Sequence, residues 1–297
     1  TLPSQIKRLS LSRPVKSSLY FVLFSTKPRL MRPGSQRYNH RMIELAKSHR
    51  SIRSYTPQEI DDSLLNDILL AGLRSSSAGN MQTWSVIVTR DKARKRRLYE
   101  LHRWQKFVLE APVLLTFCAD VFRMREWIRV NNSKQSFDDF LGFLTGTVDA
   151  VIAAQTIALA AESVGLGICY LGTTWWAADE IVEMMELPKG VMPVTSLTVG
   201  YPAEDPALRD RLPLELMVHI EKYQRMTDDG ILESHAEREK NAWARYNAVE
   251  RIRVKLAEAG ITKVTDYYTS EFKYSKELHY NISLLLLDLL KEQELWL

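Results

Sequence analysis

The chain has 297 residues, of which 45% are hydrophobic and 26% charged, a composition typical of a soluble globular protein with a sizeable core. Its formal net charge of +4 arises in residues 1–41, which hold nine Lys and Arg and no acidic residue. Residues 42–297 hold the other 31 basic residues and all 36 acidic ones, so their net charge is −5. That balance gives no electrostatic indication of a nucleic-acid partner, and the longest wholly apolar runs, 19–24 and 284–287, are too short to predict a membrane-spanning helix.

Residues 1–41 form a Ser-rich, Arg-rich segment with scattered Pro. This composition resembles an organellar transit peptide, whereas a bacterial signal peptide fits less well because the apolar stretch is brief and no small-residue cleavage site follows. A third interpretation is upstream sequence translated ahead of a start at Met42, or sequence added in cloning. We favour the third interpretation, and under all three we expect the segment to be disordered or non-native and to carry no chemistry.

A helix is predicted to begin at "TPQE", residues 56–59, where Thr is the N-cap, Pro takes the first helical position and Glu lies three residues after the cap. Apolar residues then repeat at helical spacing up to a loop rich in Ser and Gly, "GLRSSSAGN". A strand is predicted at 84–90, followed by a basic surface helix at 91–101 and a second strand at 113–120, bounded by Pro112.

Residues 137–165 predict one long helix, and small residues along it permit close approach by another helix. These small residues are Gly146, Ala150, Ala153, Ala154 and Ala158. Strands are predicted at 167–172 and 192–202, and further helices at 231–259 and 275–292. Single strands separated by helices indicate an α+β fold with helical layers on the faces of a sheet, and the long connections allow either parallel or mixed strand order.

Cys118 and Cys169 both lie in apolar, strand-like runs, and we interpret them as buried free thiols. Their spacing matches neither a disulfide framework nor a zinc site. This pattern suits a reducing compartment, so we expect a cytoplasmic location and no bound metal.

Three polar clusters far apart in the sequence carry the residues best suited to chemistry: "HRSIRS" at 49–54, "SSSAGNMQTW" at 75–84 and "DPALRDRLP" at 205–213. Alternate residues of an extended segment point the same way, so Arg209 and Arg211 form a two-pronged cationic feature. Arginine suits bidentate phosphate binding, and together with Arg50 these side chains can neutralise one phosphate dianion. Each cluster alone is also typical of a solvated loop, so the residues by themselves indicate a candidate phosphate site and no more.

Four motifs together resemble the FMN-dependent nitroreductase family: "HRSIRSY", "SSSAGNMQTW", "GTVDAVIAAQTIALAAESVGLGICYLGT" and "GYPAEDPALRDRLP". The resemblance runs from about Met42 to the C-terminus and is strongest to the larger, often NADPH-linked group of oxygen-insensitive nitroreductases and flavin reductases. It implies a three-layer fold with a central mixed β-sheet flanked by helices. It further implies that 42–297 is one FMN-binding domain with a C-terminal helical extension, and that an intertwined homodimer holds each flavin at the subunit interface.

At the phosphate end of FMN, the resemblance assigns two groups of residues. His49, Arg50 and Ser51 match positions that hold the phosphate and the ribityl chain. Arg209 and Arg211 match the two basic phosphate ligands of the family. The same residues that indicate a phosphate site by their chemistry are therefore the ones that the resemblance assigns to the FMN phosphate.

At the flavin ring, Arg53 matches the cationic position beside N1 and O2. Hydride arrival at N5 leaves negative charge there, so a fixed guanidinium tunes the potential of the cofactor. The other ring assignments are Gln105 at the pyrimidine edge, Tyr170, Leu171 and Gly172 beside the isoalloxazine, and Ser77 and Gln82 in a Ser-rich loop that can come from the partner subunit.

The resemblance implies an FMN-dependent NAD(P)H oxidoreductase that passes two electrons by ping-pong hydride transfer to nitroaromatics, quinones or related acceptors. The rivals are an NAD(P)H:flavin reductase that supplies free reduced FMN, and a flavin-binding protein without turnover. NADPH-preferring relatives carry an Arg-rich stretch before the last helix, where this sequence has Lys263, Lys273 and Lys276 and no Arg. The choice between NADH and NADPH therefore stays open, as does the physiological acceptor.

Overall fold

The structure is a computed structural model that describes residues 40–296. The basic segment predicted at 1–41 lies outside the described residues, except for His40 and Arg41. Arg41 is the first residue of helix α1 (Arg41–Lys47), which directly precedes the polar cluster that begins at His49.

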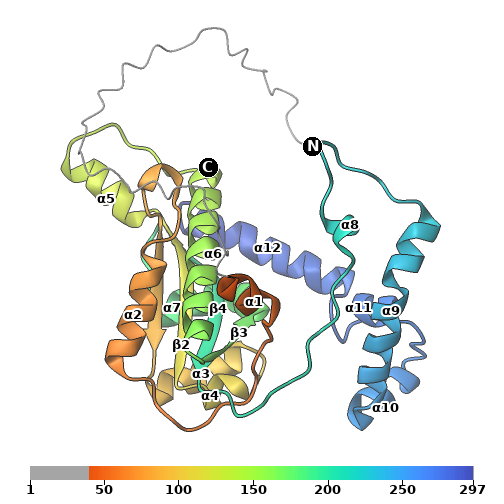
Figure 1. Cartoon of the computed structure of the whole chain (residues 1–297). Coiled ribbons are helices and arrows are strands. Elements are labelled where there is room, and N and C mark those ends of the chain that lie inside the picture. The colour runs from red at the N-terminus through yellow and green to blue at the C-terminus, as the bar shows by residue number, and fades with distance from the viewer. Residues whose placement is uncertain (1–39, 297) are drawn as a thin grey trace, which may run out of the picture. The chain divides into compact units, whose positions relative to one another are not determined.

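A four-stranded antiparallel sheet forms the centre of the fold (Figure 1). Its strands are β1 (Trp84–Thr89), β2 (Val113–Asp120), β3 (Gly167–Leu171) and β4 (Val191–Gly200), in the order β1-β2-β4-β3. All four match strands predicted from the sequence. The expectation of a mixed sheet is wrong for the described strands, because all three strand pairings are antiparallel. The connections β1–β2 and β3–β4 each return the chain to the end of the sheet from which it left. Strands β2 and β3 run in the same direction on either side of β4, so the connection between them crosses the length of the sheet without pairing the two strands directly.

Helices cover both faces of the sheet, as the three-layer expectation requires. Every residue of β2 is buried, because its alternate side chains point to opposite faces and both faces are covered. Leu115 and Phe117 belong to a core cluster with helices α2 (Asp62–Gly72) and α6 (Phe140–Ser163). Leu114 belongs to a second cluster under the helices on the opposite face, which are α3 (Lys92–Leu101), α4 (Phe107–Glu110) and α7 (Ala178–Met184).

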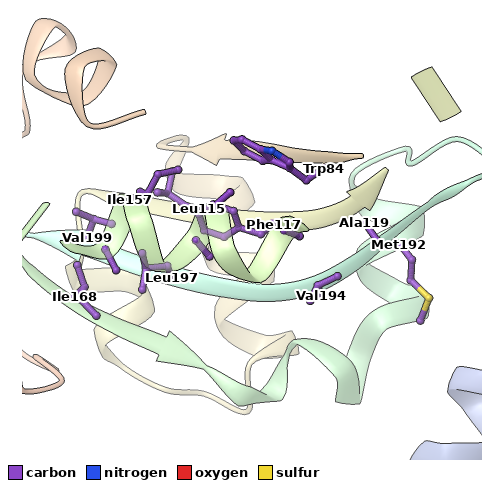
Figure 2. Packing of buried hydrophobic residues seen from close by; sticks show 14 of the residues in the cluster. Trp84, Leu115, Phe117, Ala119, Ile157, Ile168, Met192, Val194, Leu197 and Val199 are labelled. Carbon is purple, nitrogen blue, oxygen red and sulfur yellow. The ribbon is translucent and has the colours of Figure 1, made fainter. Parts of the chain in front are cut away.

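Part of the first cluster is drawn in Figure 2, where side chains of the sheet gather around α6. The labelled members are Trp84, Leu115, Phe117, Ala119, Ile157, Ile168, Met192, Val194, Leu197 and Val199. Both cysteines are buried free thiols, which confirms that expectation. Burial raises the pKa of the Cys118 thiol to about 12, so it stays protonated and inert.

The small residues of α6 face the sheet, with α2 alongside, and are not available to another subunit. A Cβ added at Gly146 would lie 2.8 Å from the carbonyl oxygen of Thr83 and 3.1 Å from the Cβ of Ala119, so only glycine permits this approach. Helix α6 is long and apolar enough to span a membrane by length and hydropathy. Its packing on β2 and α2 is that of the core helix of a folded domain.

The first long helix begins later than the capping motif predicts. Helix α2 starts at Asp62 with Asp61 as its N-cap, so the prediction that Thr56 caps a helix is wrong. The Thr56 amide instead donates to the carbonyl of Tyr201 at 2.9 Å, and the neighbouring Tyr55 forms a β-bridge with Pro202. This pairing with the chain just after β4 keeps residues 55–56 extended, which a local sequence motif does not reveal.

The C-terminal extension is helical, as predicted, and is more divided than predicted. It comprises α8 (Leu214–Met217), α9 (Asp228–Asn247), α10 (Glu250–Glu258), α11 (Val264–Thr269) and α12 (Lys276–Glu292). The helix predicted at 231–259 is broken where Val249 takes an extended conformation, and α11 was not predicted. Helices α9 to α11 supply no member of either core cluster among the described residues, whereas Leu289 and Leu290 of α12 belong to the first cluster.

Candidate functional site

A cavity of about 510 Å³ brings together six of the twelve residues assigned from the sequence. These six are His49, Arg50, Ser51, Arg53, Arg209 and Arg211. We call this space the cationic cavity; Arg245, Tyr246 and Lys273 from the C-terminal extension complete its charged and aromatic wall. Two clusters 160 residues apart in the chain thus meet in one place, together with a third segment that was not predicted.

The segment that carries the first cluster is fixed by one buried residue. Ile52 is 6% exposed, and its amide donates to the carbonyl of Ile168 in β3 at 2.9 Å. A Cβ at Gly167 would lie 2.6 Å from the Ile52 side chain, so the contact is close. Because alternate residues of an extended segment face opposite ways, the burial of Ile52 turns Ser51 and Arg53 toward the cavity.

Carboxylates bind three of the cluster residues. The Nδ1 atom of His49 lies 2.6 Å from Oε1 of Glu162 at the C-terminal end of α6. Nη1 of Arg50 donates to Oδ1 of Asp205 at 2.5 Å and to the carbonyl of Pro206 at 3.1 Å. The amide of Arg53 donates to the Glu204 carboxylate, which leaves its guanidinium exposed.

Arg209 and Arg211 both reach the cavity, while Asp210 between them points to α9. Asp210 accepts from Nη1 of Arg245 at 3.0 Å and from Nδ2 of Asn241 at 3.2 Å. The bond from Arg245, supported by Asn241, lowers the pKa of the Asp210 carboxyl, so it stays ionised at neutral pH. Within residues 40–296, neither Arg209 nor Arg211 forms an ion pair with a carboxylate, so both guanidinium groups remain available to an anionic ligand.

The sequence patterns do not place the C-terminal wall at this cavity, although Lys273 lies in the stretch where NADPH-preferring relatives carry arginines. Nζ of Lys273 lies 4.1 Å from the ring centroid of Tyr268 and within 5.8 Å of three further tyrosine rings, and it donates to the Tyr246 hydroxyl at 3.2 Å. Burial among these rings lowers the pKa of Lys273. The sequence shows several tyrosines after residue 265. Their positions in the sequence do not reveal that they surround Lys273 or that this lysine lies near Arg209 and Arg211.

Four of the residues assigned to the flavin ring form a separate group around the end of β3: Gln105, Tyr170, Leu171 and Gly172. Leu171 is buried, Tyr170 is half-buried, and Gly172 is exposed with no atom within 4 Å of an added Cβ. Nε2 of Gln105 donates to the Thr173 hydroxyl at 3.1 Å, so Gln105 is held next to Gly172. None of these lines the cationic cavity.

A neighbouring cavity of about 570 Å³ adjoins the cationic cavity. It shares His49, Arg209 and Arg211 with the cationic cavity and adds Gln155 of α6. The Tyr170 hydroxyl donates to Oε1 of Gln155 at 3.4 Å, so Gln155 reaches from this cavity to the ring group.

A buried histidine shares a hydrogen-bond partner with Gln105 of the ring group. His102 is 0% exposed, and its Nδ1 lies 2.9 Å from the hydroxyl of Thr173, the same hydroxyl that Gln105 contacts. Burial lowers the pKa of His102 to about 4, so the imidazole is neutral at pH 7. His102 therefore adds no charge to the site and acts on it through Thr173.

Ser77 and Gln82 do not reach the cationic cavity within one chain. The Ser77 hydroxyl donates to Oδ2 of the buried Asp149 at 2.7 Å and accepts from the Gln82 amide. Ser77 lines a different hollow of about 490 Å³ with the exposed face of α6, and Gln82 lines another beside β1. In residues 40–296 there is also no group of three or more His, Cys, Asp or Glu side chains arranged to hold a metal ion.

Comparisons with known proteins give consistent matches. The model of the nitroreductase family matches residues 46–201. The chain is 40% identical over 187 residues to "FMN reductase [NAD(P)H]" of Bacillus subtilis, covering 61% of this chain and 75% of the relative. It is 37% identical over 186 residues to the "Oxygen-insensitive NADPH nitroreductase" of Salmonella typhimurium, covering 61% and 74%. The solved structure of the NfrA1 nitroreductase from B. subtilis aligns with a TM-score of 0.73 at 28% identity, over 86% of this chain and 98% of that one.

Proposed function

The chain belongs to the nitroreductase family, and from that premise we propose that it is an FMN-dependent NAD(P)H oxidoreductase that reduces nitroaromatics, quinones or related acceptors by two electrons. The observation that carries the proposal is the cationic cavity, in which Arg50, Arg209 and Arg211 converge from distant parts of the chain. When bound, FMN supplies the chemistry of accepting a hydride from NAD(P)H and passing it on.

The donor set of the cavity fits the phosphate end of FMN. Arg209 and Arg211 present guanidinium groups without carboxylate partners in the described chain, and Ser51 and His49 stand beside them. Guanidinium groups bind phosphate oxygens through paired, charge-assisted hydrogen bonds. Arg50 is shared with Asp205, so it contributes charge and also anchors the loop that carries the other two arginines.

The ring end of the site fits a flat, partly polar group. No atom lies within 4 Å of a Cβ added at Gly172, and the proposal assigns the ring to this open space, which any larger residue would narrow. Gln105, held by Thr173, provides an amide for the polar edge of that ring. Arg53 lines the cationic cavity with an exposed guanidinium, and the proposal assigns it to stabilise negative charge that develops on the bound ring.

The exposed side of α6 supports a homodimer. Leu141 is 69% exposed, Val148 56% and Val151 47%, and Leu144 and Ile152 extend the same apolar face. Ser77 lies against this face, so a second copy seated here would receive the Ser-rich loop near its own site. The proposal assigns the dimer contact to this apolar face, and not to the small residues of α6, which pack inside the chain.

NAD(P)H:flavin reductase activity is the second candidate, favoured by the name of the B. subtilis relative. Both activities use the same bound FMN and differ only in the acceptor that enters the site. We place the enzyme in the cytoplasm, which supplies NAD(P)H and keeps Cys118 and Cys169 as the free thiols described above.

The test is reconstitution followed by steady-state turnover. The purified chain should take up FMN in a 1:1 ratio and oxidise NADH or NADPH with a nitrofurazone-type acceptor or a quinone. A much larger kcat/KM for free FMN than for these acceptors would favour the flavin reductase. A chain that cannot be loaded with FMN would refute both.

A further inference from the structure

Asp210 occupies an unexpected position for a phosphate site, because it is an anion directly between two arginines that line the cavity. Its carboxylate points away from the cavity and accepts from Arg245 and Asn241, which lie one turn apart on α9. Through charge alone, Asp210 would repel a phosphate bound by Arg209 and Arg211. Its contacts with α9 indicate a different role.

The segment that carries the arginines has no regular secondary structure to hold it. Residues 203–213 contain no helix or strand, so their backbone is not ordered by a ladder of hydrogen bonds. Side-chain contacts fix the segment instead. Near one end, Glu204 accepts from the Arg53 amide and Asp205 pairs with Arg50 at 2.5 Å; at the other end, Asp210 pairs with Arg245 at 3.0 Å and accepts from Asn241.

The direction in which Asp210 points decides where its neighbours point. In an extended segment, a residue held on one side turns the residues before and after it to the other side. Nη1 of Arg211 also donates to the carbonyls of Arg209 and Asp210 at 3.3 Å, which holds this side chain against its own backbone. Tethering Asp210 therefore orders both phosphate-binding side chains before the ligand arrives.

We propose that Asp210, Arg245 and Asn241 form a positioning clamp that fastens segment 205–211 to α9 and thereby sets the affinity for the FMN phosphate. The clamp rests on the proposed function, since it acts through Arg209 and Arg211 as phosphate ligands. It gives the C-terminal extension a part in cofactor retention, although α9 lies outside both core clusters.

Removal of the Asp210 carboxylate distinguishes the two roles. If Asp210 acted only by repelling the phosphate, its removal would strengthen FMN binding, whereas loss of the clamp should weaken it. Equilibrium titration of the apoprotein with FMN and with riboflavin, followed by flavin fluorescence, should be run on wild type, Asp210→Ala, Arg245→Gln and Arg245→Lys. We expect Asp210→Ala and Arg245→Gln to weaken FMN binding by roughly tenfold and Arg245→Lys to recover most of the loss. Riboflavin lacks the phosphate, so its Kd should stay unchanged in all variants.

Glu237→Gln is the matched control, because Glu237 also accepts from Asn241, at 3.3 Å, and does not contact the segment. Its FMN affinity should equal that of wild type. Tighter or unchanged FMN binding in Asp210→Ala would overturn the clamp, as would an equal loss for riboflavin, which would indicate general damage. Failure of the wild-type chain to bind FMN at all would instead refute the proposed function, so the two failures are distinguishable.

Discussion

The buried carboxylate of Asp149 accepts a hydrogen bond from the Ser77 hydroxyl at 2.7 Å, and so fixes the Ser-rich loop to the middle of α6. The same carboxylate accepts from the amide of Ala78 at 3.0 Å and from the amide and hydroxyl of Thr83. Asp149 is 1% exposed, so no water replaces these bonds. One acidic side chain thus determines the shape of a loop that we propose to complete the partner's site.

Asp149→Ala should lower the free energy of unfolding by about 3 kcal/mol, because it leaves the buried amide and hydroxyl of Thr83 without their acceptor and also removes the bonds to Ser77 and Ala78. Denaturation by urea measures the change. Asp138→Ala, an exposed carboxylate just before the same helix, is the control and should change stability by less than about 0.5 kcal/mol. A loss below 1 kcal/mol in Asp149→Ala would contradict this role for the carboxylate.

His102 should make the fold sensitive to mildly acidic pH. Its pKa is lowered from 6.5 to about 4 in the folded chain, so the neutral form contributes stability that is complete above pH 6.5 and is lost as the pH falls toward 4. Between pH 7 and pH 5, wild type should lose roughly 2 kcal/mol more of its unfolding free energy than His102→Asn, which has no proton to take up. Urea denaturation at the two pH values measures the difference, and parallel losses in the two proteins would exclude His102 as the cause.

Substitution by alanine should affect flavin binding at Gly172 and stability at Gly146. A Cβ at Gly172 meets nothing within 4 Å, so Gly172→Ala should leave the melting temperature unchanged and weaken FMN and riboflavin binding alike. A Cβ at Gly146 would lie 2.8 Å from a backbone oxygen, so Gly146→Ala should cost roughly 1–3 kcal/mol of stability. Thermal melts and flavin titrations on both variants check the pair, and unaltered flavin affinity in Gly172→Ala would place the ring elsewhere.

Much of the fold follows from local sequence patterns, and the failures come from contacts between distant segments. The buried runs of β2 and β4 and the long α6 are visible in the sequence, because burial on both faces favours mostly apolar residues. The start of α2 was mispredicted because the capping motif at Thr56 is overridden by a hydrogen bond to Tyr201, far away in the chain.

For the candidate site, too, local patterns predicted some features, whereas contacts between distant segments were not predicted. The alternation of Arg209 and Arg211 predicted that both point to one side, and the cavity lining agrees. Arg245 was not predicted, and Lys273 was named only for the nucleotide preference, because nothing in their own neighbourhood shows that α9 and the loop before α12 meet the arginine segment. The role of Asp210 was missed for the same reason, since its partner lies 35 residues away.

The exposed apolar face of α6 should hold two copies of the chain together. Val148→Arg places a charge where the proposed partner packs, and should weaken dimerisation by at least roughly 100-fold and reduce FMN retention. Sedimentation velocity over a range of protein concentrations measures the shift. Val130→Arg, at a 60% exposed position on α5 (Phe122–Val130), is the control and should remain dimeric. A dimer of unchanged affinity in Val148→Arg would move the interface to another surface.

The most direct test of the proposed activity is anaerobic stopped-flow mixing of the FMN-loaded protein with NADH and, in parallel, with NADPH. Loss of flavin absorbance should be complete with at least one nucleotide, and the ratio of the two rates gives the nucleotide preference. Arg53→Ala should slow this step by roughly 100-fold and lower the flavin potential, because the positive charge that faces the developing negative charge is gone. A bound flavin that neither nucleotide reduces would show a binding protein without turnover, and would contradict the account.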